Sequence, residues 1–426
     1  MSSLSLPREI IDHIIDIIAE ARQNRETLRI CSQVARIFVQ RAHHHLFSNF
    51  QFFWVENGYA EALENLLQVL RNGLQFPGIG IVNHVRHFHL HGPVSDRQLF
   101  LTANHTALFK LLYSINGLEC LSLWLYISFL SLDEECRASL ITLCHSPNLK
   151  TLIVRYLFDI PKSLLHGSRI KRIDLSSVSF LSYPPEQPKI LYQPESILAR
   201  DSYFHTLLDA FHAGGGEIER STRYKEVLAF LKELDLTINN VLDIPSCLDK
   251  ASFARVLEDI KLTMDIPFPS TLLSPKSNPI FLFHNFLNLR ILRLDFHQSS
   301  FGELVITPVR EFLEFSILPP LLEKLFLSVG MHLQLTVGEG GILSPFELDN
   351  VGWKLLDATL TRPPFCTIPL AMLNLRYFVR LMVTPDCKLD GDALFECARE
   401  SILRDGLPRS TSSRPPWVVV DANVYL

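Results

Sequence analysis

The chain has 426 residues, 47% of them hydrophobic, which is enough apolar material for two or three domains or for one long array of repeats. The net charge of −5, from 40 basic and 45 acidic residues, lacks the basic excess that is typical of nucleic-acid-binding proteins. The mean hydropathy of +0.17 is high, yet the longest uncharged apolar run, at 120–132, is shorter than the roughly 20 residues that a membrane-spanning helix needs. We therefore expect neither nucleic acid nor a membrane as a partner.

The cysteines and the N-terminus indicate the compartment. The eight cysteines are scattered and form no CxxC pair, as is typical of a reducing compartment. The first residues show no basic segment followed by a long apolar stretch, so no secretory signal is expected. We expect a cytoplasmic and/or nuclear protein.

Two amphipathic helices are predicted at the start of the chain. Residues 7–20 place Ile10, Ile11, Ile14, Ile15 and Ile18 on one face at helical spacing, and a second helix is predicted over about 26–42. So small a unit buries little apolar surface by itself, and a residue such as Ile17 has no obvious place inside it. The surplus apolar surface predicts either a binding partner or a cap on the domain that follows.

Three segments in this order carry a family resemblance. They are 6–15 (LPREIIDHII), 28–38 (LRICSQVARIF) and 42–47 (AHHHLF), and they resemble an F-box, as found in the F-box domain-containing proteins of mushroom-forming fungi. The chain departs from the family pattern at Ala35, where Cys is frequent, and at Phe38, where Trp is frequent. Both replacements keep the site apolar.

The resemblance implies a partner and a set of contact residues. F-box modules are helical units that pack on the adaptor subunit of SCF-type (cullin-RING) ubiquitin ligases. Carried over to this chain, the adaptor-binding residues or their immediate support are Leu6, Pro7, Ile10, Ile11, Ile14, Leu28, Cys31, Val34 and Phe38. The module would span 1–55, and its partners would be the adaptor subunit and the cullin core.

The rest of the chain repeats one motif, apolar-x-x-apolar-x-apolar. Copies begin at Val85, Leu118, Leu149, Ile170, Leu231, Leu257, Leu289, Leu322 and Phe378, with a weaker copy over 353–360. Most copies start 21 to 33 residues apart, close to the unit length of leucine-rich repeats. The longest gap, rich in proline and glycine, holds either an inserted loop near 181–220 or a repeat with a decayed strand.

Strands that alternate with helix-like segments predict an α/β fold over 56–405. The helix-like segments are 133–145, 221–230, 251–257, 309–315 and 392–403. The fold would be an irregular leucine-rich repeat horseshoe, a solenoid with a parallel inner sheet. The asparagine that such repeats usually carry after the third apolar position occurs only once, at Asn239, so an unrelated α/β fold with leucine-rich strands stays open. Residues 406–426 are predicted to be a partly disordered tail, in which 417–420 is either a last strand or a cap.

The x positions of the motif predict a binding surface. They point to the concave face of the horseshoe, where aromatic and arginine side chains are typical anchors for a protein partner. The candidate target-binding residues are His89, Trp124, Arg155, Arg293 and Phe326.

No enzyme motif is present: there is no GxSxG, HExxH, P-loop or GxGxxG. His87, His89 and His91 would share one strand face, but no cysteine or acidic residue nearby in sequence completes a metal shell. We expect no catalysis, no metal and no cofactor. The sequence thus favours a substrate-recognition adaptor of an SCF-type ligase that binds an unknown protein target, with a repeat scaffold outside any ligase as the alternative.

Overall fold

The computed structural model describes residues 7–20, 25–53, 58–75, 81–92, 103–181, 192–200, 207, 224–238, 243–266, 281–298, 306–336, 350–382, 400, 404, 407 and 418–425. The chain divides into two compact units. The first comprises Met1–Pro194 and Thr206–Gly215, and the second comprises Glu195–His205 and Gly216–Leu426.

Three short helices open the first unit: α1 (Arg8–Glu20), α2 (Arg25–Val34) and α3 (Arg36–Phe47). The prediction of one helix over 26–42 is wrong, because the backbone of Ala35 is extended, with φ −149° and ψ 142°. On one straight helix Leu28 and Ala42 would lie roughly 21 Å apart. The break at Ala35 lets both reach Ile15 of α1, and the three side chains form the buried core of this helical module.

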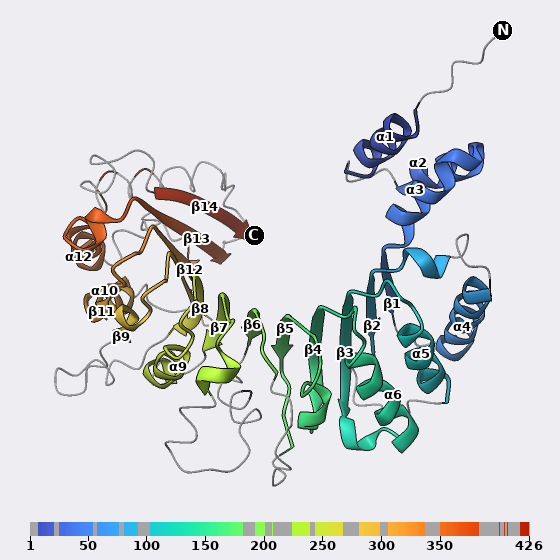
Figure 1. Ribbon diagram of the computed structural model, residues 1–426. Coiled ribbons are helices and arrows are strands. Elements are labelled where there is room, and N and C mark those ends of the chain that lie inside the picture. Colours follow the sequence, from blue (N-terminus) through green and yellow to red (C-terminus); the bar gives the residue numbers. More distant parts are fainter. Residues whose placement is uncertain are drawn as a thin grey trace. The chain divides into compact units, whose positions relative to one another are not determined.

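The strands of the first unit are parallel and lie in chain order: β1 (Asn49–Phe53), β2 (His87–His91), β3 (Cys120–Ser128), β4 (Thr151–Phe158) and β5 (Arg172–Ser176). The helices α4 (Tyr59–Gln75), α5 (Ala103–Tyr113) and α6 (Glu134–Cys144) alternate with the strands and lie along one side of them (Figure 1). The register places one fully apolar row across the sheet: Phe52, Leu90, Leu123, Val154 and Leu175. All five side chains are buried, so this row belongs to the core under the helices.

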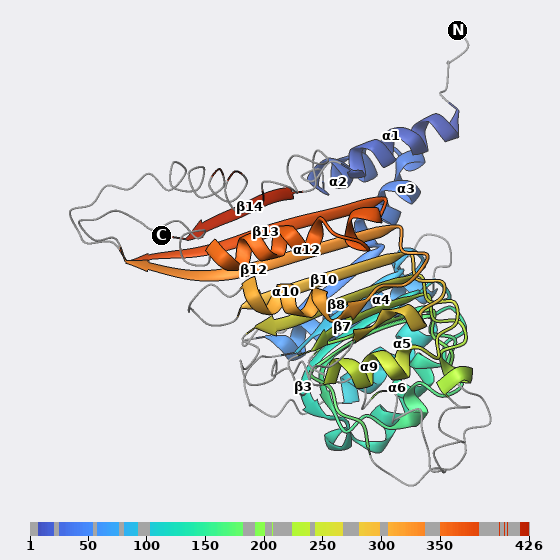
Figure 2. The same cartoon turned by 90° about the vertical axis from the view of Figure 1, so that its left-hand side faces the viewer.

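The second unit repeats this design. Its parallel strands are β6 (Ser196–Ala199), β7 (Glu233–Ile238), β8 (Asp259–Ile266), β10 (Ile291–Gln298), β12 (Lys324–Thr336), β13 (Leu370–Met382) and β14 (Val418–Tyr425). The helices α9 (Asp243–Ala251), α10 (Ile306–Glu314) and α12 (Asn350–Leu360) lie along them (Figure 2). A short parallel pair, β9 (Phe281–Leu282) with β11 (Ser316–Ile317), accompanies them. Leu236, Leu262, Leu294, Leu327 and Leu373 form the buried row.

The predicted α/β class, a parallel sheet built from stacked strand–helix repeats, is therefore confirmed. In both units the apolar residues of the strand motif alternate with residues on the opposite face, as the two-residue period of a strand requires. No helix of the described residues combines the length and apolar character needed to cross a bilayer.

A shared backbone arrangement joins consecutive repeats. The carbonyl oxygen of the residue before one strand accepts hydrogen bonds from two successive N–H groups that lead into the next strand. At the first joint, the N–H groups of Arg86 and His87 donate to the Ser48 oxygen at 2.9 and 2.8 Å. The same arrangement recurs at the Glu258 carbonyl in the second unit. These bonds fix the register of each new strand against the preceding one.

Asparagines occupy a different place from the one that the repeat pattern predicts. The Asn148 side-chain amide donates to the Asn116 carbonyl at 2.6 Å, and the Asn288 amide donates to the Arg255 carbonyl at 2.6 Å. Both asparagines precede a strand and bond to the backbone of the preceding repeat. They satisfy backbone carbonyl groups of the neighbouring repeat, as the side chains of the missing asparagine ladder would have done.

Three strand positions differ from the sequence prediction. The motif also fits β1, with Phe50 and Phe52, and β6, with Ile197 and Ala199, so the long gap contains a decayed strand. The copy assigned to Phe378 is misplaced, because Leu327 pairs with Leu373 and the motif of that repeat therefore lies earlier in β13. Of the predicted segment 417–420, which is either a last strand or a cap, the described residues 418–420 belong to β14, the last strand.

One helix also differs. The segment 251–257 was predicted to be helical, but α9 ends at Ala251. Pro245 lies in the first turn of α9, where a helix needs no N–H donor, and this position marks the true start. The helix predicted over 392–403 lies largely outside the described residues.

Candidate functional site

The helical module divides the predicted adaptor-binding residues into two groups. Ile11 and Leu28 are buried, and Cys31 and Phe38 pack partly buried against the module core. Pro7 is exposed, and Ile10, Ile14 and Val34 are 47%, 43% and 70% exposed. Leu6 lies outside the described residues. The first group therefore supports the fold, and the second group is available to a partner.

Further apolar side chains extend the exposed group. Ile17 is 55% exposed and continues the face of α1 that carries Ile10 and Ile14 at i, i+4 and i+7. Ile30 and Ile37 are also exposed, on α2 and α3. A module that already has its own core thus leaves several large aliphatic side chains in solvent, which is typical of an interaction surface.

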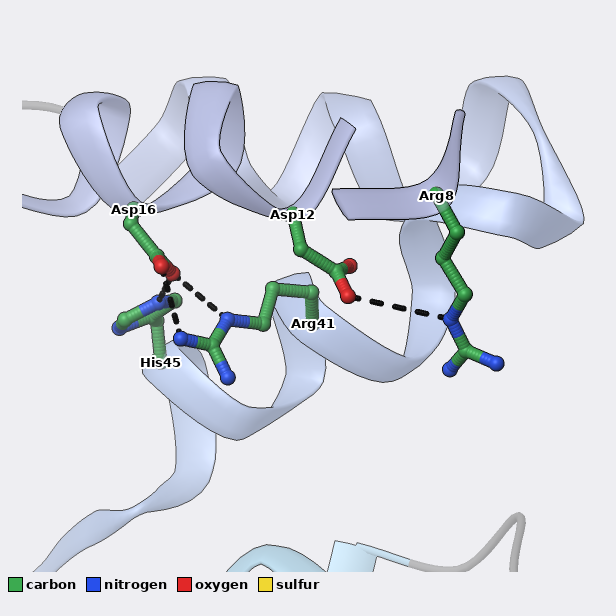
Figure 3. Close-up of polar contacts among 5 residues, drawn as sticks. All are labelled: Arg8, Asp12, Asp16, Arg41 and His45. Atoms are coloured by element: carbon green, nitrogen blue, oxygen red, sulfur yellow. Dashed lines mark hydrogen bonds and ion pairs between the residues drawn. The ribbon is translucent and has the colours of Figure 1, made fainter. Parts of the chain in front are cut away.

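Polar contacts hold α1 against α3 on a different face (Figure 3). The Arg41 guanidinium donates to both oxygens of Asp16, at 2.6 and 2.7 Å, and the His45 ring lies 2.7 Å from the same carboxylate. The hydrogen bonds from Arg41, and then from His45, hold the pKa of Asp16 well below its ordinary value. Arg8 lies 3.8 Å from Asp12 and also donates to Gln40 of α3. These bonds orient α1 and leave its isoleucine face free.

The sheet of the first unit carries a continuous row of side chains on the face opposite its buried rows, here called the open face. The register aligns Phe53, His91, Trp124 and Arg155 on neighbouring strands. Ring centroids lie 4.6 Å apart between Phe53 and His91 and 4.4 Å apart between His91 and Trp124. The Arg155 guanidinium lies over the Trp124 ring at 4.2 Å from the centroid and 3.8 Å from the Asp174 carboxylate.

This row and the neighbouring row of the open face, which contains His89 and Asp174, hold polar atoms without hydrogen-bond partners in the described part of the chain. Among the described residues, none forms a hydrogen bond to His89 Nε2, Trp124 Nε1, Arg155 Nε or one Asp174 oxygen, although each of these atoms is buried. An unpaired buried donor or acceptor costs about 1–3 kcal/mol. Burial lowers the pKa of His89 and of His91, so both rings are neutral at pH 7. The row therefore offers aromatic faces and unused polar groups on a rigid sheet.

The open face of the second unit is dominated by charge pairs. Lys261 lies 3.6 Å from Asp235 and 3.5 Å from Asp295. Arg293 reaches both oxygens of Asp259, at 3.3 and 2.8 Å, and its guanidinium lies 5.3 Å from the centre of the Phe326 ring. Burial raises the pKa of Asp235, against the lowering effect of Lys261.

The structure thus brings the predicted target-binding residues together in pairs. Trp124 contacts Arg155, and Arg293 contacts Phe326. His89 lies on the same strand as His91, the register partner of Trp124, two residues before it. Sequence reasoning missed Phe53, because the strand β1 was not assigned. The alternation of Phe50, Gln51, Phe52 and Phe53 was the available signal.

The histidines do not assemble a metal site in the described part of the chain. No group of three histidine, cysteine, aspartate or glutamate side chains there is arranged to hold a metal ion. The ring centroids of His89 and His91 are 6.4 Å apart, and His91 instead stacks on Phe53 and lies against Trp124 in a tilted arrangement.

Comparison with known proteins gives little beyond this geometry. No protein-family model matches the chain, and no curated protein matches it. Among solved structures, the chain is similar to the one described as "Crystal structure of TLR13-ssRNA13 complex", with 16% sequence identity and a TM-score of 0.34. The likeness covers 78% of this chain and 44% of that chain, so this chain spans less than half of that protein. The assignment of the repeat fold follows from the strand register and the helices described above, and not from this likeness.

Proposed function

We propose that the chain is a protein-binding adaptor whose helical module, residues 8–47, docks as an F-box on the adaptor subunit of an SCF-type ubiquitin ligase. The repeat body holds a protein target. The chain performs no chemistry itself. Its mechanism is effective concentration, because a target and a ligase that are held on one chain react as if they were one molecule.

The exposed aliphatic face of α1 carries this proposal. Ile15, which is 1% exposed, points into the module core, whereas the neighbouring Ile14 is 43% exposed. The α1–α3 ion pair at Asp16 fixes the helix so that this face stays outward. The resemblance of the 6–47 segment to an F-box assigns the occupant of the face.

Co-purification of the full chain with the adaptor subunit tests the proposal. The variant is Ile14→Asp, because a carboxylate buried without a partner at an interface costs several kcal/mol and abolishes capture. The matched control is Val351→Asp, which places the same charge at a 69% exposed position of α12, outside the module. Circular dichroism of each protein checks that it is folded.

Two outcomes are decisive. Capture by the wild type and by the Val351 variant, with loss in the Ile14 variant, is the expected result. A folded wild type that captures no adaptor overturns the ligase role and leaves the second candidate, a repeat scaffold whose helices serve as a cap.

The open face of the sheet is the proposed target surface in either case. Trp124 and Arg155 in the first unit, and Phe326 and Arg293 in the second, are aromatic and arginine side chains on rigid strands, which are the residue types most often found as binding anchors. Trp124→Ala and Phe326→Ala each remove one anchor, and the loss of a target from one of these variants in pull-down experiments would identify the unit that carries the target surface.

A further inference from the structure

A basic hollow lies where the helical module meets the first repeat. It has a volume of about 260 Å³ and lies between α1, α3 and the segment from η1 (Ile81–His84) to Arg86. The residues that line it include three arginines, Arg8, Arg41 and Arg86, and two histidines, His44 and His84, with Asp12 as the acidic residue. All these residues belong to the first unit.

The three arginines of the hollow differ in how closely a carboxylate neutralises their charge. Arg41 is paired with Asp16 at 2.6 Å, and Arg8 is only loosely paired with Asp12, at 3.8 Å. For Arg86, no carboxylate of the described residues lies within ion-pair distance. Positive charge therefore exceeds negative charge around the hollow.

The position of Arg86 is built into the chain. Its guanidinium lies directly against Gly117, at a place that a side-chain Cβ on that residue would fill. The N–H of Arg86 is also held by the Ser48 carbonyl at 2.9 Å, so the backbone from which the side chain extends is fixed.

The burial and the positive charge around the hollow also change the pKa values of its two imidazoles. Burial lowers the pKa of His44 and of His84, and neighbouring cations and imidazoles lower both further, so both rings are neutral at pH 7. The charged and titratable groups that act on them are Arg41, Arg86, His43, His45 and Asp16, of which only Asp16 opposes the lowering. An anion in the hollow would favour protonation of both rings, and acid would therefore strengthen its binding.

The size of the hollow limits the ligand. Sites for drug-sized molecules are about 300–1,000 Å³, and one water occupies about 30 Å³ of liquid. The hollow suits a small ion that retains some of its hydration. Guanidinium groups bind phosphate-type anions through two parallel hydrogen bonds.

We propose that this hollow binds a small multivalent oxyanion of the phosphate type, held by Arg8, Arg86 and the two imidazoles. The ion bridges α1 and α3 to the start of β2. Its binding therefore stiffens the joint between the helical module and the first repeat. This inference does not depend on the identity of the module's partner.

Isothermal titration of the full chain tests the site, with inorganic phosphate, sulfate and O-phosphoserine as probes in chloride buffer of constant ionic strength. We expect saturable binding of one ion per chain. Sulfate keeps its charge between pH 8 and 6, so tighter sulfate binding at the lower pH reports the imidazoles. Tighter binding of O-phosphoserine than of phosphate assigns the site to phosphate esters, and the reverse assigns it to the free ion.

Arg86→Gln should weaken binding by about tenfold or more, because it removes a charge-assisted donor pair. The matched control is Arg29→Gln, an exposed arginine of α2 that pairs with Glu26 outside the hollow. Equal affinity of the wild type and the Arg86 variant overturns the proposal, as does equal weakening in the Arg29 variant. Absence of saturable binding by a folded wild type overturns it as well.

Discussion

The contact between Arg155 and its two neighbours on the open face gives a quantitative prediction. Arg155→Met keeps the length of the side chain but removes the cation over the Trp124 ring, a contact of about 0.5–2 kcal/mol. It also leaves Asp174, which is 7% exposed, without its ion-pair partner at 3.8 Å, at a cost of about 1–3 kcal/mol. We expect the single variant to lose about 1.5–5 kcal/mol of local stability.

The double variant separates the two contributions. Asp174→Asn in the Arg155→Met background removes the unpaired carboxylate, so it should recover about 1–3 kcal/mol. Hydrogen exchange of the β3–β5 amides measures the stability of this part of the sheet, and urea unfolding measures that of the whole chain. If the effects of the two substitutions are simply additive, Asp174 does not depend on Arg155 and the reasoning fails.

Three further predictions concern the helical module and its joint. Ile15→Ala should cost about 2–5 kcal/mol in exchange protection of α1, and Ile14→Ala less than about 0.5, and equal losses would contradict the assigned faces. The folded-state pKa of Asp16 is lowered, so its ion pair, worth up to about 1 kcal/mol, contributes above about pH 4 and is lost as the pH falls. Asp16→Asn should therefore flatten the acid limb of a melting-temperature profile, and an unchanged limb would refute this. Gly117→Ala should displace the Arg86 side chain and weaken oxyanion binding in titration while the circular dichroism spectrum stays unchanged.

The strand motif predicted most of the repeat fold, because its two-residue alternation reports directly which side chains are buried. Leu236, Leu262, Leu294 and Leu327 were assigned to successive copies and do form one buried row. The copy at Phe378 failed for a physical reason. Apolar residues recur from one end of the long strand β13 to the other, so the pattern fits the strand at two places, and only pairing with β12 selects one.

The break at Ala35 could not be predicted from local pattern. Leu28, Cys31, Phe38 and Ala42 fit one continuous helical stripe, and alanine is a strong helix former. The chain breaks there because tertiary packing on Ile15 outweighs the local preference for helix. Likewise, Trp124 and Arg155 were predicted as separate residues of one face, but their contact could be found only from the register between β3 and β4.

The joint at Ser48 has a mechanical consequence. α3 ends at Phe47 and β1 begins at Asn49, so a single residue separates the helix from the sheet, and its carbonyl is held by Arg86 and His87. A linker of one residue with a hydrogen-bonded carbonyl leaves few backbone dihedral angles free to rotate. One residue inserted there would turn the helical module by about 100° about the α3 axis, since a helix has 3.6 residues per turn. A partner bound to the module is consequently held at a fixed orientation to the first repeat. The length of the linker at Ser48 therefore sets this orientation, whereas a flexible linker would limit only the distance.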